Sequence, residues 1–167
     1  METLLVINDQ ENKNNPVLEK REAVRIIIFD ENNLIPLLFV SKHGYHKLPG
    51  GGIEAGEDIN TALAREVLEE AGCKIKSIDA EVGKIIEYRL KWNLLQMSYC
   101  YMGTISSKGE PSFTAEERSG GFEIIWTDID GAIKMVENDH PANYEGGLIQ
   151  QRDLAFLKKA KEILGGK

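Results

Sequence analysis

The chain has 167 residues, of which 42% are hydrophobic and 28% are charged, and its formal net charge is −7. This length and composition predict one globular domain over residues 1–167. The acidic balance argues against a broad surface for nucleic acid or anionic membrane. It does not argue against a small phosphorylated substrate, because a metal ion can bridge acidic side chains and phosphate.

The N-terminal residues and the cysteines bear on cellular location. The segment METLLVINDQENKNN lacks a basic stretch and a long apolar run, so it does not resemble a signal peptide. No apolar stretch approaches the ~20 residues that span a bilayer. Cys73 and Cys100 suggest neither a disulfide framework nor a zinc spacing. We therefore expect a cytoplasmic protein with no membrane partner and two buried thiols.

The first half of the chain predicts strands followed by one helix. A short strand is expected at 3–7, and a polar loop at 8–16. A β-branched apolar run predicts a buried strand at 23–30, which the turn ENN joins to a strand at 34–42 in a hairpin. A helix is expected at about 58–71, because Gly72 stands where a C′ glycine belongs.

The second half predicts a return to strands before two final helices. Two longer strands are expected within 74–90 and 94–105, around a turn at 91–93, with a further strand at 121–129. Helices are expected at 130–138 and 145–164. This order is not a regular βαβ alternation, so the expected architecture is an α/β fold with a mixed β-sheet packed between α-helices.

The predicted helix at 58–71 crowds three acids onto one face. Glu66, Glu69 and Glu70 are related by i, i+3 and i+4 spacings, and like charges at such spacings destabilise an isolated helix by roughly 0.2–0.5 kcal/mol per pair. The helical periodicity places Val67 and Leu68 toward the core and the acids along the edge of that apolar arc, where a cleft wall would lie. A bound divalent cation is the simplest compensation for this crowding.

Clustered carboxylates are compatible with four interpretations. They can perform general acid–base catalysis, or they can bind magnesium or manganese through oxygen ligands. They can also do both together in a metal-assisted attack on phosphorus. The fourth interpretation is an acidic surface that merely faces solvent. The residue types alone leave all four open.

The spacing in residues 51–73 selects among them. The segment matches the pattern GX5EX7REUXEEXG, whose chance occurrence is on the order of 10⁻⁸ per starting site. It resembles the signature box of the Nudix hydrolase family, also called MutT-like. The preceding LPGG resembles the family too, whereas Cys73 and His46 stand where a larger aliphatic residue and a tryptophan are common. The matching residues are Gly51, Glu57, Arg65, Glu66, Val67, Glu69, Glu70 and Gly72.

The resemblance implies the Nudix fold and a metal-dependent reaction with Mg²⁺ or Mn²⁺. A nucleoside diphosphate linked to another group would be cleaved to a nucleoside monophosphate and the phosphorylated remainder. Glu66 and Glu70 would be the principal metal ligands, and Glu69 would be a further ligand or would hold a metal-bound water. The backbone carbonyl of Gly50 would complete the ligand set.

The resemblance also implies supporting roles and leaves the general base open. Arg65 would orient a glutamate of the box, and Glu57 would fix the loop to the helix. Glu116 or Glu117, in an expected loop just before the strand at 121–129, is the expected general base, and Glu66 is the rival. Weaker candidates for contacts with substrate are Arg25, Lys42, His43, Lys47, Tyr88, Trp92, Tyr99, Tyr101, Tyr144 and Arg152.

The expected partner is a small nucleotide, with a modified nucleoside triphosphate as the first choice. A stable complex with nucleic acid is not expected, and the sequence leaves open whether the chain forms a homodimer. The alternative function is a Nudix-type module that senses a nucleotide or metabolite without cleaving it. Such modules commonly lose acids of the box, which are all present here.

Overall fold

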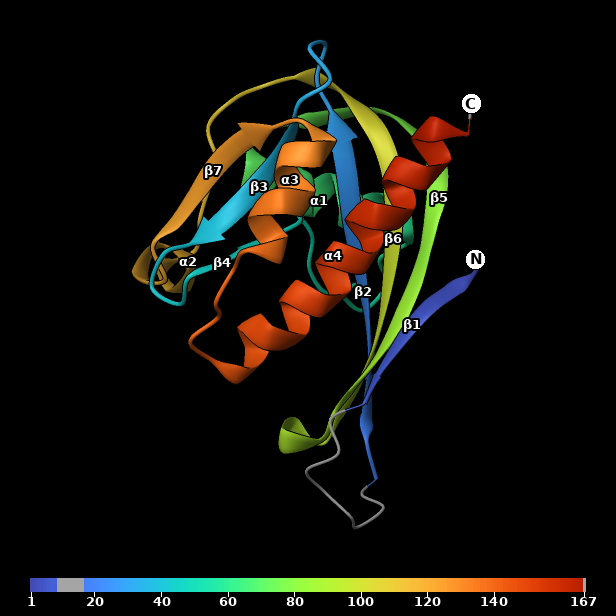
Figure 1. The fold of residues 1–167 in the computed structure, drawn as a ribbon, viewed down its shortest axis with the longest axis vertical. Coiled ribbons are helices and arrows are strands. Elements are labelled where there is room, and N and C mark those ends of the chain that lie inside the picture. The colour runs from blue at the N-terminus through green and yellow to red at the C-terminus, as the bar shows by residue number, and fades with distance from the viewer. Residues whose placement is uncertain (9–16, 167) are drawn as a thin grey trace.

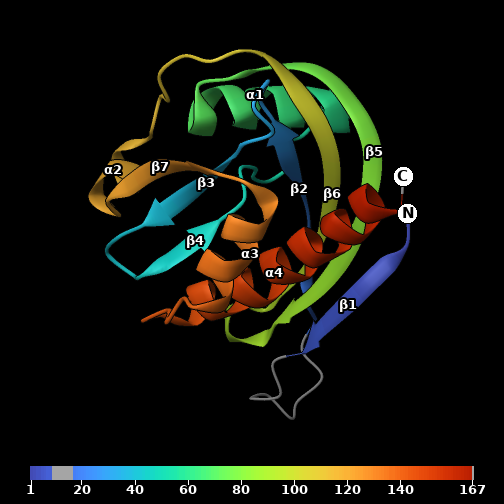
Figure 2. The ribbon, with the colours of Figure 1, turned by 45° about the horizontal axis from the view of Figure 1, so that its top comes forward.

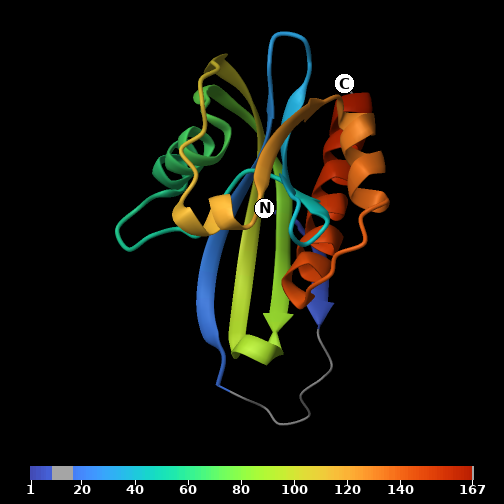
Figure 3. The ribbon, with the colours of Figure 1, turned by 90° about the vertical axis from the view of Figure 1, so that its left-hand side faces the viewer.

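The structure, a computed structural model, describes residues 1–8 and 17–166. Helix α1 (Ile59–Ala71) covers one side of the strands, whereas α3 (Ile129–Glu137) and α4 (Tyr144–Gly165) cover the other, as Figures 1 and 3 show. Of the loop expected at 8–16, all but Asn8 lies outside the described residues. No helix formed by the residues described here is long and apolar enough to cross a bilayer.

The larger sheet has four strands in the order β1-β5-β6-β2. β5 and β6 are antiparallel, whereas β1 runs parallel to β5 and β2 parallel to β6, so this sheet is mixed, as the sequence predicts. It is strongly curved (Figure 2). Its strands are Thr3–Asn8 (β1), Glu19–Phe29 (β2), Lys74–Arg89 (β5) and Leu94–Ser107 (β6), with the single 3₁₀ turn Leu90–Trp92 between the last two.

A second, antiparallel sheet has the order β4-β3-β7. The hairpin expected from 23–30 and 34–42 is wrong, because β2 pairs with β6 and β3 pairs with β4 and β7. The carboxylate of Asp30 accepts hydrogen bonds from the backbone N–H groups of Asn32 and Leu34, both at 2.8 Å. This side-chain closure turns the chain without requiring the flanking strands to pair. The strands are Ile35–Val40 (β3), Tyr45–Lys47 (β4) and Phe122–Thr127 (β7).

From Ala23 to Ile28, strand β2 is buried on both faces because it separates two parts of the core. Val24, Ile26 and Ile28 pack on the side of α1, whereas Ile27 packs with residues of α3 and α4. Successive side chains of a strand point to opposite faces. Arg25 therefore shares the face of Ala23, Ile27 and Phe29, so an arginine stands within the apolar part of that face.

Helix α1 has the predicted bounds but not the predicted buried face. Asp58 caps its start by accepting the Thr61 N–H, and Gly72, with φ of 65°, ends it. Val67 is buried, but Leu68 is 49% exposed, so its predicted place in the core is wrong. The reason is that Glu66 and Glu70 do not flank the buried face. They lie on it, in the rows of Leu63 and Val67.

A short helix, α2 (Ala115–Ser119), occupies the segment expected to be a loop. The Thr114 hydroxyl accepts a hydrogen bond from the Glu117 N–H, and the Glu117 carboxylate accepts one from the Thr114 N–H. This capping box stabilises one helical turn. It also fixes the position of Glu117 beside β7.

Candidate active site

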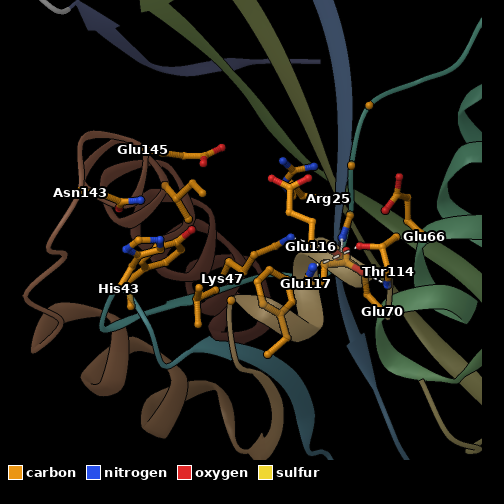
Figure 4. A pocket seen from close by; sticks show the side chains of 18 of the residues that line it. Arg25, His43, Lys47, Glu66, Glu70, Thr114, Glu116, Glu117, Asn143 and Glu145 are labelled. Carbon is orange, nitrogen blue, oxygen red and sulfur yellow. Dashed lines mark hydrogen bonds and ion pairs between the residues drawn. The ribbon is translucent and has the colours of Figure 1, made fainter. Parts of the chain in front are cut away.

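A pocket of about 640 Å³ opens between α1, α2 and the N-terminal end of α4. Figure 4 shows Glu66 and Glu70 on one side and Asn143 and Glu145 on the other, with Arg25 and Lys47 between them in this view. Its volume lies within the range of small-molecule sites, roughly 300–1,000 Å³. The predicted candidates that line it are Arg25, Lys42, His43, Lys47, Gly50, Gly51, Glu66, Glu70, Glu116, Glu117 and Arg152.

The carboxylate of Glu70 is almost fully enclosed. Glu70 is 3% exposed, and it accepts hydrogen bonds from the Gly50 N–H at 2.7 Å and from the Lys47 ammonium at 2.6 Å. Burial raises the pKa of Glu70, because the loss of hydration outweighs the support from these two donors. The loop before the helix and a residue of β4 thus converge on one carboxylate.

Arg65 links three parts of the signature segment. Its Nε and Nη2 donate to the two oxygens of Glu57 at 2.8 and 2.9 Å, and its Nη1 donates to Glu66 at 2.7 Å. Nη2 also donates to the Gly52 carbonyl at 3.0 Å. The planar guanidinium therefore holds the Glu66 carboxylate, which is buried, against the loop that carries Glu57.

Two glycines bring the loop against β2 and α1. Gly50 has φ of 137°, and a Cβ there would lie 2.1 Å from the Val24 carbonyl oxygen. A Cβ at Gly51 would lie 2.1 Å from a carboxylate oxygen of Glu66. The Val24 N–H donates to the Gly51 carbonyl at 2.9 Å, which fixes this close approach. The spacing of the glycines is therefore a steric requirement of the site.

The remaining predicted acids are placed differently. The Glu69 side chain is 49% exposed, 3.5 Å from Arg65, and it does not line the pocket. Glu116 and Glu117 both line the pocket from α2. The Glu117 carboxylate is engaged in the capping box, whereas the Glu116 side chain is exposed. Within the described part of the chain, no three His, Cys, Asp or Glu side chains converge as a preformed metal site.

Several pocket residues were not identified from the sequence. Glu87 and Arg89 are two apart in β5, so they share a face, and Arg89 and Gln96 line the pocket. In the strand segment KIIEYRL, opposite charges two positions apart indicate an ion pair on one face. Tyr45 and Phe122 also line the pocket, whereas Tyr88, Trp92, Tyr99 and Tyr101 do not.

The Glu57–Arg65 pair should make stability depend on pH. Hydrogen bonds from Arg65 lower the pKa of Glu57 from 4.5 to about 2. Because the folded pKa is the lower one, the contribution is fully present above about pH 4.5 and is lost as the pH falls toward 2. We expect Glu57→Gln to lower the unfolding temperature at neutral pH, and the difference from wild type to shrink over this interval.

Circular dichroism melts of both proteins from neutral pH down to about pH 2 test this prediction. Glu54→Gln serves as the matched control, because the Glu54 side chain is exposed in the same loop. Its melting curve should follow that of the wild type. A Glu57→Gln difference that stays constant down to the lowest pH would contradict the assignment.

Comparison with known proteins gives one family. The model of the NUDIX domain matches residues 19–146. The RNA pyrophosphohydrolase of Pelagibacter ubique is 34% identical over 83 residues, or 47% of this chain and 51% of the relative. The enzyme of the same name from Wolbachia pipientis is 29% identical over 127 residues, or 74% of this chain and 70% of the relative. The chain thus spans about half the length of the first relative.

A solved structure supports the same fold. The structure of a NUDIX hydrolase from Nitrosomonas europaea superposes with a TM-score of 0.63 at 18% identity, covering 86% of this chain and 90% of that one. At this identity the similarity establishes the fold alone. The family model, which covers more than half of the chain and the whole of residues 51–73, establishes the family. The chain belongs to the Nudix family and has the Nudix fold.

Proposed function

We propose that the protein is a metal-dependent Nudix hydrolase. It would cleave a phosphoanhydride bond in a nucleoside diphosphate linked to another group, releasing a nucleoside monophosphate and the phosphorylated remainder. The observation that carries the proposal is the pair of buried carboxylates, Glu66 and Glu70, on the wall of a pocket that also presents Lys42 and Lys47. The carboxylates of Glu66 and Glu70 would by themselves repel a phosphorylated substrate. A bound divalent cation would bridge them to the phosphate.

The donor set fits Mg²⁺ or Mn²⁺. Magnesium is usually held by one or two carboxylates together with substrate phosphates and waters. Glu66 and Glu70 would supply the carboxylates, and the Gly50 carbonyl a further oxygen. Glu69, which is half exposed, would act at a distance through a water. When bound, the cation would neutralise phosphate charge and acidify a water.

The chain's own groups would position the substrate and move the proton. Lys47 lies 2.6 Å from Glu70, so its ammonium can shift from that carboxylate to a phosphate oxygen of the substrate. Arg65 and Glu57 would hold Glu66 in place. For the general base we propose Glu116, because its exposed carboxylate faces the pocket whereas those of Glu117 and Glu66 are already hydrogen-bonded.

For the substrate class we propose nucleoside triphosphates, with release of pyrophosphate. The names of the two RNA pyrophosphohydrolase relatives extend the class to 5′-triphosphorylated RNA ends, without a stable complex with the nucleic acid. We also propose that the chain acts as one domain in the cytoplasm. Its two cysteines are free and buried, which suits a reducing compartment.

A substrate panel tests this function directly. Purified protein with Mg²⁺ should hydrolyse at least one of ordinary and oxidised nucleoside triphosphates, 5′-triphosphorylated RNA, ADP-ribose, sugar nucleotides and dinucleoside polyphosphates. Excess chelator should abolish turnover. Full activity in chelator would contradict the metal-dependent mechanism. Metal-supported binding without turnover of any compound would instead identify a sensing module.

Gly51→Ala should show how much of the activity depends on the shape of the loop, because it leaves every carboxylate of the site in the sequence. The new methyl group would lie 2.1 Å from the present position of a Glu66 oxygen, so the carboxylate must move. We expect kcat/KM to fall about tenfold to a hundredfold, because misplacing a reacting group by about 1 Å has effects of this size. Steady-state kinetics check the prediction, with Gly147→Ala on the open surface of α4 as the matched control. Unchanged kinetics in Gly51→Ala would contradict it.

A further inference from the structure

Three buried arginines from different elements line the pocket. Arg25 lies on β2, Arg89 ends β5 and Arg152 lies on α4. They are 7%, 3% and 0% exposed, respectively. In Figure 4, Arg25 lies between the acids of α1 and the two labelled residues at the start of α4. We call Arg25, Arg89 and Arg152 the arginine cluster.

The buried carboxylates beside the cluster already have partners. Glu87 accepts hydrogen bonds from Arg89, Gln96 and Ser98 at 2.7–2.9 Å. Asp153 accepts them from the Arg152 Nε at 2.7 Å and from the Leu48 N–H at 2.8 Å. The guanidinium of Arg25, by contrast, donates to the backbone carbonyl of Val24 at 2.6 Å.

The cluster therefore carries more positive charge than its buried neighbours balance. Three guanidinium groups face the two fully buried carboxylates Glu87 and Asp153. The other two buried glutamates of the pocket are already paired, Glu70 with Lys47 and Glu66 with Arg65. Glu145 lies 3.8 Å from Arg89, but its side chain is 46% exposed, and the Glu116 side chain is exposed as well. Burial and the nearby Arg152 lower the pKa of Arg25 to about 10, so Arg25 stays charged at neutral pH.

Hydrogen-bond donors of the cluster are also left over. Among the described residues, Arg25 Nε and both Arg152 Nη atoms are buried without a hydrogen-bond partner. Arg152 Nη1 is 3.8 Å from Glu87, too far for a hydrogen bond. Buried hydrogen-bond donors rarely lack an acceptor in folded proteins. A guanidinium group can donate two parallel hydrogen bonds to the oxygens of one phosphate. An excess positive charge and unused donors at one place both indicate an oxyanion.

We propose that the arginine cluster is a subsite for a terminal phosphate of the substrate, carried on the group linked to the scissile diphosphate. This inference rests on the proposed function and narrows its substrate class to diphosphate compounds whose other end bears a phosphomonoester. The three side chains are at most 7% exposed, so the cluster presents a small area that suits a compact group such as a phosphomonoester. Nucleoside 3′-phosphates and sugar phosphates are the two sources of such a group.

The first experiment measures phosphate binding without catalysis. Inorganic phosphate is titrated calorimetrically into the whole chain in excess chelator, where the acids of α1 cannot hold a cation. We expect saturable binding to the wild type that Arg25→Met weakens at least about tenfold, the effect of losing one hydrogen bond to a charged group. Lys20→Met is the matched control, because Lys20 is an exposed cation on the same strand outside this pocket. It should bind as the wild type does.

The second experiment measures the effect of the terminal phosphate on turnover. ATP is compared with adenosine 3′-phosphate 5′-triphosphate, and ADP-ribose with its 1″-phosphate. In the wild type, the added phosphate should raise kcat/KM at least about tenfold for one pair. In Arg25→Met the ratio should approach one. Arg25→Lys keeps the positive charge but loses the planar guanidinium group that can donate two hydrogen bonds to one phosphate. Its ratio should therefore lie between those of the wild type and Arg25→Met.

Thermal melts show whether Arg25 is merely structural. Arg25 lacks a carboxylate partner, so Arg25→Met should unfold at the same or a higher temperature than the wild type. A lower unfolding temperature, unchanged phosphate binding in Arg25→Met, or the absence of any phosphate binding by the wild type would each overturn the inference. If the protein hydrolyses a compound but shows no preference for the added phosphate, the subsite is refuted and the proposed function is not. If it binds phosphate but hydrolyses no compound, the proposed function is refuted and the phosphate site is not.

Discussion

Glu70→Gln should lower kcat at least about a hundredfold, a loss of about 2.7 kcal/mol of transition-state stabilisation. The amide keeps an oxygen that can accept the Gly50 N–H but removes one of the two buried negative charges that would hold the cation. The effect should therefore be on catalysis and on Mg²⁺ affinity more than on the fold. Steady-state kinetics on the most active compound of the panel and a calorimetric Mg²⁺ titration measure both.

The adjacent glutamate provides a sharp comparison. Glu69→Gln changes the same kind of residue one position away, but the Glu69 side chain is 49% exposed and outside the pocket. We expect its effect on kcat to be at least about tenfold smaller, because screening by solvent weakens an exposed charge. Equal losses in the two variants would contradict the assignment of Glu70, and not Glu69, as a direct metal ligand. Wild-type activity in Glu70→Gln would refute the mechanism itself.

Arg65→Met should reduce both activity and stability. It removes hydrogen bonds to Glu57, Glu66 and the Gly52 carbonyl, and leaves two partly buried carboxylates unpaired. Because the Arg65 side chain is only 24% exposed, we expect a loss of about 2 kcal/mol in the free energy of unfolding. For a chain of this size, that loss lowers the unfolding temperature by roughly 4–8 °C.

The activity of the Arg65 variants should distinguish the role of the positive charge at this position from the role of the planar guanidinium group. We expect kcat/KM to fall about tenfold to a hundredfold in Arg65→Met, the size seen when a group that orients a metal ligand is removed. Arg65→Lys keeps the charge without the planar fork, so its kcat/KM and unfolding temperature should both be intermediate. If Arg65→Met melted and turned over substrate as the wild type does, its supporting role would be refuted.

Local signals predicted the bounds of α1, but not its orientation. Asp58 and Gly72 cap the helix through contacts within a few residues, which the sequence displays directly. The buried face depends on which distant segment packs against the helix. Hydropathy assigned Leu68 to the core and the acids to its edge, although the pocket encloses Glu66 and Glu70 and leaves Leu68 exposed.

The pairing of the strands and the arrangement of side chains inside the pocket also cannot be predicted from short sequence patterns. The turn after β2 fits a hairpin as well as the observed separation into two sheets, and only long-range pairing with β6 and β7 decides between them. Arg25 and Arg152 are 127 positions apart in sequence. Each was a candidate for contact with substrate, but their joint excess of charge is visible only once β2 and α4 are placed together.

The loop of residues 49–53 also covers part of an exposed sheet edge. β2 is an edge strand of the larger sheet, and an edge with free backbone groups can pair with another chain. Here the N–H groups of Val24 and Ile26 donate to the carbonyls of residues 51 and 49, and the Glu22 carbonyl accepts the Ile53 N–H. Residues 49–53 thus occupy the backbone groups of this edge between Glu22 and Ile26. We therefore expect a substitution that lifts this loop to expose the edge of β2 and to disturb the pocket wall formed by Gly50, Gly51 and Gly52, so that solubility and activity fall together.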